Sequence, residues 1–312
     1  MRRAIISLGT NSTRLLIVEV ASDGRLIERY HEAVLTRLGE GLGDRGKLAP
    51  AAIARTLAVV ERYARRVRDD GAASVAIATS AVRRADDGET FRARFRTIAG
   101  VELEVIGGEE EARYSFLGAT YGRLPIERVA VLDIGGGSTE LAVGKAEVEA
   151  AISIEIGAVR LTELFPGLAG HDGPGAAASA SRLAERYVRP LLAAYERLPA
   201  PESVMAVAGT PLTIAAMADV SALADGQTLT ASQAQEVLDL LLRTPYEARR
   251  RLEGMTPDRA DILAAGAIIY IAALRALKRP DARVTQNDLL LGYLSLELLA
   301  RAAVRMRYQR DS

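Results

Sequence analysis

The feature that most constrains the fold is a short motif that occurs twice, 126 positions apart. Residues 4–18 read AIISLGTNSTRLLIV and residues 130–144 read AVLDIGGGSTELAVG, so that Gly9 aligns with Gly135 and Ser12 with Ser138. Each copy is an apolar run, a Gly-rich polar turn and a second apolar run, which is typical of a β-hairpin whose tip approaches a ligand. Glycine allows backbone N–H groups at such a tip to point at an anion such as phosphate. The duplication therefore predicts two related lobes whose phosphate loops face one cleft.

Composition limits the class of protein. The 312 residues exceed the usual size of one domain, which favours two domains. The balance of 40 basic and 40 acidic residues argues against nucleic acid as a partner. The chain has no cysteine and only His31 and His171, which excludes a disulfide framework and a zinc site. The N-terminus is too short and polar for a signal peptide, and no apolar run reaches the roughly 18 residues of a membrane span, so we expect a cytoplasmic protein with no membrane partner.

Strand-like and helix-like segments alternate, which indicates an α/β fold with helices covering mixed sheets. We expect a helix after Pro50, because apolar residues recur there at helical spacing. The second half is mostly helical, and the Gly-, Ala- and Ser-rich stretch 167–180 is predicted to be a surface loop. The expected strands and later helices are 3–8, 14–20, 25–38, 73–78, 101–106, 128–134, 139–143 and 203–207, and 175–197, 231–251, 257–277 and 288–308.

The second loop, Gly135-Gly136-Gly137-Ser138-Thr139, is predicted to cradle phosphate with backbone donors and two hydroxyls. A tight hairpin turn would also need glycines, but each glycine weakens a strand by about 0.5–1 kcal/mol, which favours the functional interpretation. Asp133 ends the strand before this turn, where its oxygens could hold Mg²⁺ directly or through water. Glu140 begins the return strand and is either a second metal ligand or a solvated edge residue.

Eight segments, in order, resemble the exopolyphosphatase and guanosine pentaphosphate phosphohydrolase (Ppx/GppA) family. They are SLGTNSTRLL (7–16), RLGEGL (37–42), ATSAVRRA (78–85), GGEEEARYSFLGA (107–119), LDIGGGSTEL (132–141), IGAVRLTE (156–163), AGTPLTIAA (208–216) and DRADILAAG (258–266). The resemblance implies the actin-like ATPase (ribonuclease H-like) fold, with two related lobes around a central cleft. The lobes would be residues 1–122, joined by a C-terminal helix at 293–312, and residues 123–292.

The same resemblance implies that Glu111 is the catalytic base that activates the attacking water. The residues alone do not choose among Glu109, Glu110 and Glu111, since acidic residues are favoured in the first turn of any helix. Arg83 matches the family's phosphate-binding arginine, where a guanidinium could offset charge on the terminal phosphate, whereas Arg84 could be a surface charge.

Further positions follow from the matched motifs. Thr10, Asn11 and Ser12 belong to the first phosphate loop. Gly209 and Thr210 match a third phosphate or nucleoside loop, although an ordinary strand-to-helix turn would look the same. The implied cofactor is Mg²⁺, with Mn²⁺ as a substitute, and a homodimer is compatible with the resemblance.

The sequence departs from the family's pattern in two places. Ser7 stands where the family has an aspartate, and it also aligns with Asp133 in the internal repeat. Leu290 and Leu291 stand before Gly292, where the family has an Arg-Glu pair. Arginine clusters at 65–68, 249–251 and 301–310 are either a path for a polyanion or solvated helix faces, and the second interpretation is favoured.

These observations predict an enzyme of the stringent response or of polyphosphate turnover. It would release terminal phosphate from inorganic polyphosphate, or the 5′-phosphate of guanosine pentaphosphate. Two alternatives stay open: an ATPase of the same fold, and a non-catalytic sensor that binds polyphosphate or guanosine tetraphosphate.

Overall fold

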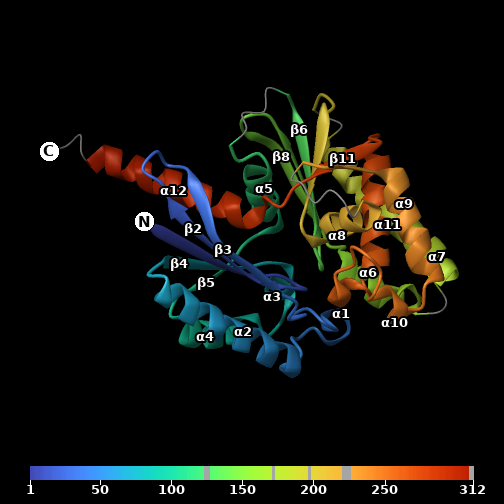
Figure 1. Ribbon diagram of the computed structural model, residues 1–312, viewed down its shortest axis with the longest axis horizontal. Helices are drawn as coiled ribbons and strands as arrows, with labels where there is room; N and C mark the ends of the chain where they lie inside the picture. The colour runs from blue at the N-terminus through green and yellow to red at the C-terminus, as the bar shows by residue number, and fades with distance from the viewer. Residues whose placement is uncertain (123–126, 171–172, 196–197, 220–225, 309–312) are drawn as a thin grey trace.

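The computed structural model describes residues 1–122, 127–170, 173–195, 198–219 and 226–308 and contains two β-sheets, one in each lobe (Figure 1). We define the first lobe by the five-stranded sheet and the second lobe by the six-stranded sheet. The first sheet has the order β3-β2-β1-β4-β5. Its strands are β1 (Arg2–Leu8), β2 (Thr13–Val20), β3 (Leu26–Val34), β4 (Ala73–Ala78) and β5 (Leu103–Val105).

The second sheet repeats this topology. Its order is β10-β11-β9-β6-β7-β8. In both sheets an antiparallel three-stranded meander is followed by parallel strands on the other side of its first strand: β1 pairs with β4, and β6 with β9. The duplication predicted from the two loops is therefore confirmed at the level of whole sheets. The strands are β6 (Val129–Ile134), β7 (Thr139–Gly144), β8 (Val148–Ile154), β9 (Ser203–Val207), β10 (Thr228–Thr230) and β11 (Asp281–Val284).

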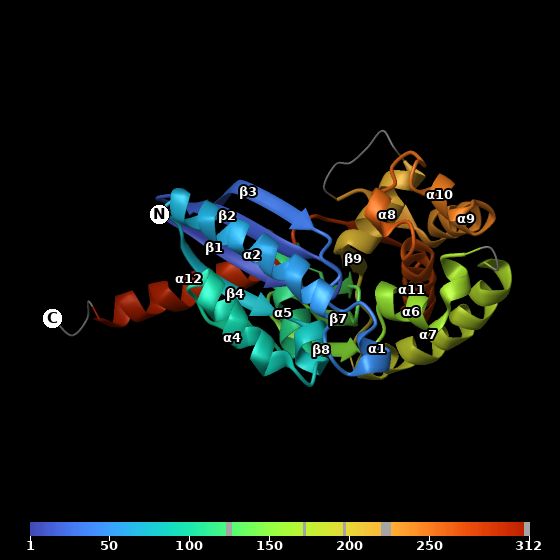
Figure 2. The same ribbon diagram turned by 90° about the horizontal axis from the view of Figure 1, so that it is seen from below.

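Each sheet is covered on its outer face by its own helices. In the first lobe, α2 (Pro50–Asp69) and α4 (Gly88–Ala99) bury their apolar sides against β1, β2 and β4 (Figure 2). In the second lobe, α11 (Leu263–Ala276) is buried almost all round because other helices surround it. Those surrounding helices are α6 (Ala158–Leu164), α7 (Gly173–Tyr195), α8 (Gly209–Ala218) and α9 (Ala231–Arg243). Three further helices of the molecule are short: α1 (Leu42–Arg45), α3 (Ser80–Arg84) and α10 (Tyr246–Arg249).

The prediction of a surface loop at Gly167–Ala180 is wrong for most of the described residues in that stretch. Pro166–Leu168 form a 3₁₀ turn, and α7 already begins at Gly173. Ala177 and Ala180 are buried in the second core, so the small residues of this stretch serve close helix packing. Residues 171–172 lie outside the described residues.

Two helices lie between the sheets. Helix α5 (Gly108–Ala119) packs its apolar side on β6, β7 and β9 of the second sheet. Helix α12 (Leu289–Tyr308) covers the inner face of the first sheet (Figure 1). Its Leu290 and Leu294 are buried in one apolar cluster with Ile5 and Leu16.

Helices α5 and α12 cross at two glycines. A Cβ on Gly118 would lie 1.9 Å from the Asp288 carbonyl oxygen, and a Cβ on Gly292 would lie 1.9 Å from the Tyr114 carbonyl oxygen. Only glycine permits this approach. The crossing holds the C-terminal half of α5 against the start of α12.

Polar contacts also join the lobes. The Arg37 guanidinium donates two hydrogen bonds to the Asp261 carboxylate, at 2.6 and 3.0 Å. The Gly41 N–H donates to Glu163 at 2.6 Å. Both contacts join the RLGEGL segment to the second lobe, at the turn before α11 and at α6. Within the described residues, no helix has the length and apolar character needed to cross a membrane.

Candidate active site

The tips of the two repeated hairpins meet at a cavity of about 200 Å³ between the lobes. A Cβ on Gly136 would lie 3.1 Å from Asn11 Cβ, and one on Gly137 would lie 2.4 Å from Thr10 Oγ1. The glycines of the second loop thus serve close approach to the first loop as well as backbone exposure. The predicted site residues that line the cavity are Thr10, Asn11, Ser12, Glu111, Asp133, Gly135, Gly136, Gly137, Ser138 and Gly209.

The first loop presents groups without partners. Both side-chain atoms of Asn11, its amide nitrogen and its oxygen, are buried and make no hydrogen bond within the described residues. A buried amide without partners costs free energy unless something else satisfies it. Because Asn11 lines the cavity, a phosphate oxygen or a water bound there would supply the missing partner.

The structure separates the three consecutive glutamates at the start of α5. Glu109 is exposed. Glu110 is exposed and accepts a hydrogen bond from the Gly107 N–H at 2.8 Å, so it caps the helix. Glu111 is buried, lines the cavity and lies near Asp133 of the second hairpin. Glu111 is thus the one glutamate of the three that can act on a bound ligand.

The Arg83 guanidinium lies beside the Glu111 carboxylate and forms an ion pair with it. Its guanidinium donates to the Ile106 carbonyl oxygen at 2.9 Å and lies 3.5 Å from Glu111 Oε2. Arg83 does not itself line the cavity, but it is one side chain away from it. A guanidinium in this position can orient the base and attract an anion into the site.

The carboxylates of the site repel one another, which favours their protonated forms. Burial first, and the Asp133 charge second, raise the pKa of Glu111 to about 8, while Arg83 acts in the opposite direction. Burial raises the pKa of Asp133 to about 6, although the Ser115 hydroxyl, which donates to Asp133 Oδ2 at 2.5 Å, lowers it. Clustered carboxylates with raised pKa values mark a site built for proton transfer or for a cation.

Three predicted residues lie behind the cavity wall. The Glu140 carboxylate is buried and accepts from the Ser153 hydroxyl at 2.7 Å, while its Oε2 has no hydrogen-bond partner among the described residues. Burial and the charges of Glu111 and Asp133 raise the pKa of Glu140 well above its usual range. The Thr139 hydroxyl donates to the Ile156 carbonyl oxygen at 2.6 Å, and the Thr210 side chain packs against Gly266. Glu140, Thr139 and Thr210 therefore do not face a ligand in the cavity.

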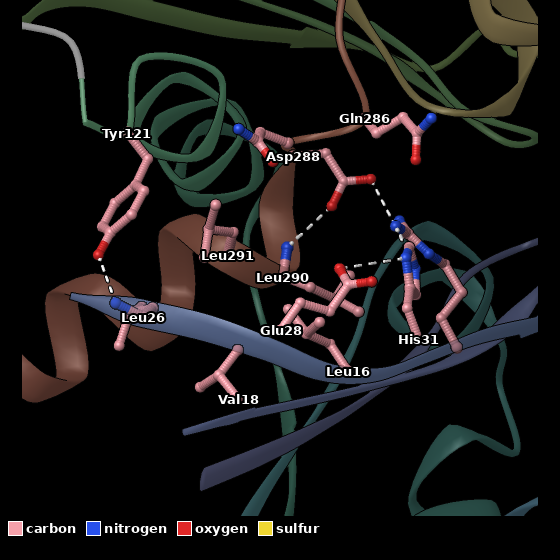
Figure 3. A pocket seen from close by; sticks show the side chains of 12 residues that line it. Leu16, Val18, Leu26, Glu28, His31, Tyr121, Gln286, Asp288, Leu290 and Leu291 are labelled. Carbon is pink, nitrogen blue, oxygen red and sulfur yellow. Dashed lines mark hydrogen bonds and ion pairs between the residues drawn. The ribbon is translucent and has the colours of Figure 1, made fainter. Parts of the chain in front are cut away.

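A charge pair that the sequence did not reveal stands beside Ser7. Arg14 lies opposite Ser7 in the β1–β2 register, and its guanidinium is 2.6 Å from Asp288 Oδ2 (Figure 3). Asp288 also accepts from the Leu290 N–H at 3.1 Å, at the start of α12. Ser7, Arg14 and Asp288 all line the cavity. A carboxylate thus reaches the first-lobe side of the site from a segment almost 300 residues away in sequence.

Arg259 is a second cation that the sequence reasoning missed. Its guanidinium lines the cavity beside Gly209 and has no hydrogen bond or ion pair with the described residues. Burial and the nearby Arg14 charge lower the pKa of Arg259 to about 10. Its place in DRADILAAG was the available signal, but the motif did not show that this arginine reaches the cavity. A partly buried cation that has no partner among the described residues is suited to bind an anion in a phosphate cleft.

Ala208, which precedes Gly209 in the third loop, has a φ of 74°. Residues other than glycine rarely adopt this conformation, and it costs of the order of 1–3 kcal/mol. The strain lies at the cavity wall, which supports a functional rather than an ordinary strand-to-helix turn at Gly209.

The second departure from the family's pattern lies in a neighbouring cavity of about 370 Å³, shown in Figure 3. Leu290 and Leu291 line it together with Leu16 and Val18 of β2. Tyr121 closes it by accepting a hydrogen bond from the Leu26 N–H at 3.0 Å. Apolar residues at positions 290 and 291 thus complete the packing of α12 on the first sheet.

The donor set suits Mg²⁺. Asp133, with Glu111 nearby, supplies the hard carboxylate oxygens that Mg²⁺ prefers, and a cation would offset their repulsion. Within the described residues, no three His, Asp or Glu side chains could surround a metal ion by themselves. Mg²⁺ is usually bound by one or two carboxylates together with water and substrate phosphate, and such a site needs no larger group of side chains.

Comparisons with known proteins show the family to which this chain belongs. The sequence profile of the Ppx/GppA phosphatase family matches residues 17–291, and the chain belongs to that family. It is 34% identical to exopolyphosphatase 2 of Mycobacterium tuberculosis, over 93% of this chain and 97% of that protein.

Solved structures agree. The crystal structure of the Aquifex aeolicus Ppx/GppA family member is 29% identical, covers 96% of this chain and 98% of its own, and has a TM-score of 0.79. An exopolyphosphatase from Cytophaga hutchinsonii shares the fold with a TM-score of 0.87 at 24% identity, over 96% of this chain and 98% of its own. The predicted actin-like ATPase fold is therefore confirmed.

Proposed function

We propose that the protein is an exopolyphosphatase, a hydrolase that releases the terminal phosphate of inorganic polyphosphate. The observation that carries this proposal is the position of Glu111, buried at the meeting point of two phosphate loops and held by Arg83. The relatives named exopolyphosphatase support the choice of substrate.

In this mechanism the terminal phosphate binds to the backbone N–H groups of Gly136 and Gly137, to the Ser138 hydroxyl and to Asn11. Glu111 accepts a proton from the attacking water as a P–O bond to that water forms. The anhydride bond to the rest of the chain breaks, and the chain leaves with the negative charge. Arg14 and Arg259 offset charge on the phosphates that lie in the cleft.

Asp133, with water and phosphate oxygens, would hold Mg²⁺ or Mn²⁺. The ion would offset charge on the phosphoryl group that is transferred. We place Glu140 behind this site, out of reach of the bound phosphate. A cytoplasmic location and a homodimer belong to this proposal as predictions.

The 5′-phosphate of guanosine pentaphosphate is the second candidate substrate, because it presents the same terminal phosphoanhydride to the loops. The decisive experiment measures phosphate release with Mg²⁺ from long polyphosphate, short polyphosphate, guanosine pentaphosphate and ATP, side by side. We expect the first three, or some of them, to be turned over well ahead of ATP. Turnover of ATP alone would indicate an ATPase, and binding of polyphosphate without any turnover would indicate a sensor.

A further inference from the structure

Three arginines at the lobe interface share one exposed glutamate. Arg83 and Arg84 come from α3 in the first lobe, and Arg160 comes from α6 in the second; we call them the arginine trio. The Glu155 carboxylate lies 3.3 Å from Arg83, 3.6 Å from Arg84 and 3.5 Å from Arg160. Ser80 also donates to it, at 3.3 Å.

The Glu155 carboxylate satisfies none of the arginine trio well, although Arg160 also donates to the Glu155 main-chain carbonyl oxygen. Guanidinium–carboxylate hydrogen bonds are typically about 2.7–2.9 Å long, and all three separations exceed that range. The Glu155 side chain is 41% exposed, so leaving this position costs it little desolvation. Arg84 has no other ion pair among the described residues, while Arg83 also lies 3.5 Å from Glu111, so that three positive charges are matched here by two carboxylates. A phosphate group, with more oxygens and more charge, would satisfy the trio better.

The position of this cluster indicates which phosphate it would hold. In-line displacement places the attacking water and the leaving chain on opposite sides of the transferred phosphorus. Glu111 marks the side of the water. Because the Arg83 guanidinium contacts both Glu111 and Glu155, the arginine trio lies on that same side. After attack, orthophosphate is released toward it.

We propose that the arginine trio is a phosphate site that Glu155 fills in the empty enzyme and vacates when released orthophosphate moves out of the cleft. Glu155 then returns to the arginines and expels the product, so that it limits product inhibition. The statement that orthophosphate moves from the cleft to the arginine trio rests on the proposed hydrolysis. The phosphate site itself can be tested without turnover.

The test is calorimetric titration of the full chain with inorganic phosphate. Removing the competing charge with Glu155→Gln should tighten orthophosphate binding by roughly two- to tenfold, as the loss of a few exposed ion pairs implies. Arg84→Ala and Arg160→Ala should each weaken it by roughly two- to fivefold. The matched control is Glu149→Gln, because Glu149 also belongs to the β8 region but pairs with Arg128 alone, and this variant should bind phosphate like the parent. Parent-like or weaker binding by Glu155→Gln would overturn the proposal, and the opposite shifts in Arg84→Ala and Arg160→Ala guard against a folding artefact.

Enzyme kinetics show whether the arginine trio binds the released orthophosphate or the next phosphate of the bound polyphosphate. If the site takes the product, Glu155→Gln lowers the inhibition constant for orthophosphate and leaves the KM for polyphosphate unchanged. A lowered KM would instead assign the site to the chain. The Glu155 charge also helps to raise the pKa of Glu111, so the variant's rate should begin to rise at lower pH. If the parent enzyme does not turn over polyphosphate, the proposed function is refuted while the calorimetric result stays valid. If turnover is normal and the phosphate affinity is unchanged in all variants, this inference alone is refuted.

Discussion

The β1–β2 and β6–β7 hairpins have the same backbone conformation at their turns, but their side chains carry opposite charges. In each, the first glycine of the turn donates its N–H to a serine carbonyl oxygen, at 2.9 Å for Gly9 and 3.1 Å for Gly135. A Cβ on either glycine would lie 3.2 Å from that oxygen. At equivalent cross-strand positions, however, the first hairpin has Ser7 opposite Arg14, whereas the second has Asp133 opposite Glu140.

The difference shows how one duplicated element can divide the work of a phosphate site. The second hairpin concentrates acidic groups beside Glu111, which suits proton transfer and a cation. The first hairpin supplies a cation and the unpartnered Asn11 amide, which suit the phosphate itself. Asp288 then supplies one carboxylate on the first-lobe side, where it pairs with Arg14.

The strongest test of the acidic side is Glu111→Gln. The amide keeps the size of the side chain but cannot accept a proton, and a general base contributes about 10²–10⁴-fold. We expect turnover to fall by that factor with little change in substrate binding, measured by phosphate release and by calorimetry. Glu110→Gln, which alters only the helix cap, is the control. A Glu111→Gln enzyme within a few-fold of the parent would remove Glu111 from the mechanism.

Ser7→Asp gives the first hairpin the carboxylate that the second one has. If a first-lobe carboxylate assists Mg²⁺, the variant should need less Mg²⁺ by roughly five- to a hundredfold, or about 1–3 kcal/mol. Direct titration with Mn²⁺, followed by electron paramagnetic resonance, gives a second readout. Ser22→Asp, at an exposed position, is the control. Identical metal titrations would mean that the new carboxylate pairs with Arg14 in place of Asp288.

The glycines test how alike the two turns are. Gly9→Ala and Gly135→Ala should lower the melting temperature by similar amounts, since each new Cβ meets a serine carbonyl oxygen at the same 3.2 Å. Gly137→Ala should cost more, about 1–3 kcal/mol of unfolding free energy, because its Cβ would collide with Thr10 Oγ1 at 2.4 Å and Ser80 Oγ at 2.8 Å. Gly175→Ala, with nothing within 4 Å, is the control. Unequal losses at Gly9 and Gly135 would show that the turns differ in packing.

The raised pKa of Glu111 also predicts an effect of pH on stability. In the folded state the pKa of Glu111 is raised to about 8 from an ordinary value of 4.5, so the folded state binds more protons than the unfolded state between these values. Stability should therefore decrease as pH rises from about 5 to 8, and Glu111→Gln should flatten that decrease. Thermal unfolding at several pH values measures it. A steeper decrease in the variant would contradict the assigned cause.

Mg²⁺ should counteract the same decrease, because a cation stabilises the ionised carboxylates of the folded state. The comparison is a melting curve at pH 8 with and without Mg²⁺, for the parent and for Asp133→Asn. We expect a rise of a few degrees in the parent only. An equal rise in both proteins would place the ion elsewhere.

The sequence by itself determined the duplicated hairpins, the alternating α/β architecture and the family, because these depend on local pattern: apolar period, glycine turns and ordered motifs. It also placed Glu111, Asp133 and the loops of Gly9 and Gly135 in one cleft. Arg249, predicted to lie on a solvated face or a polyanion path, is instead fully buried and donates to the Leu168 and Thr244 carbonyl oxygens. The side chains of 301–310 lie outside the described residues.

Only the tertiary structure decided which polar groups face the ligand. The choice among Glu109, Glu110 and Glu111 depends on how α5 is rotated between the two sheets, because that rotation buries Glu111 and leaves Glu109 and Glu110 exposed. Asp288 and Arg259 reach the cavity through packing of segments that are distant in sequence. Thr139 and Thr210 match the family's motifs, yet their side chains point away from the cavity. Local pattern specifies where a loop turns, but the direction of each side chain is set by the elements packed around it.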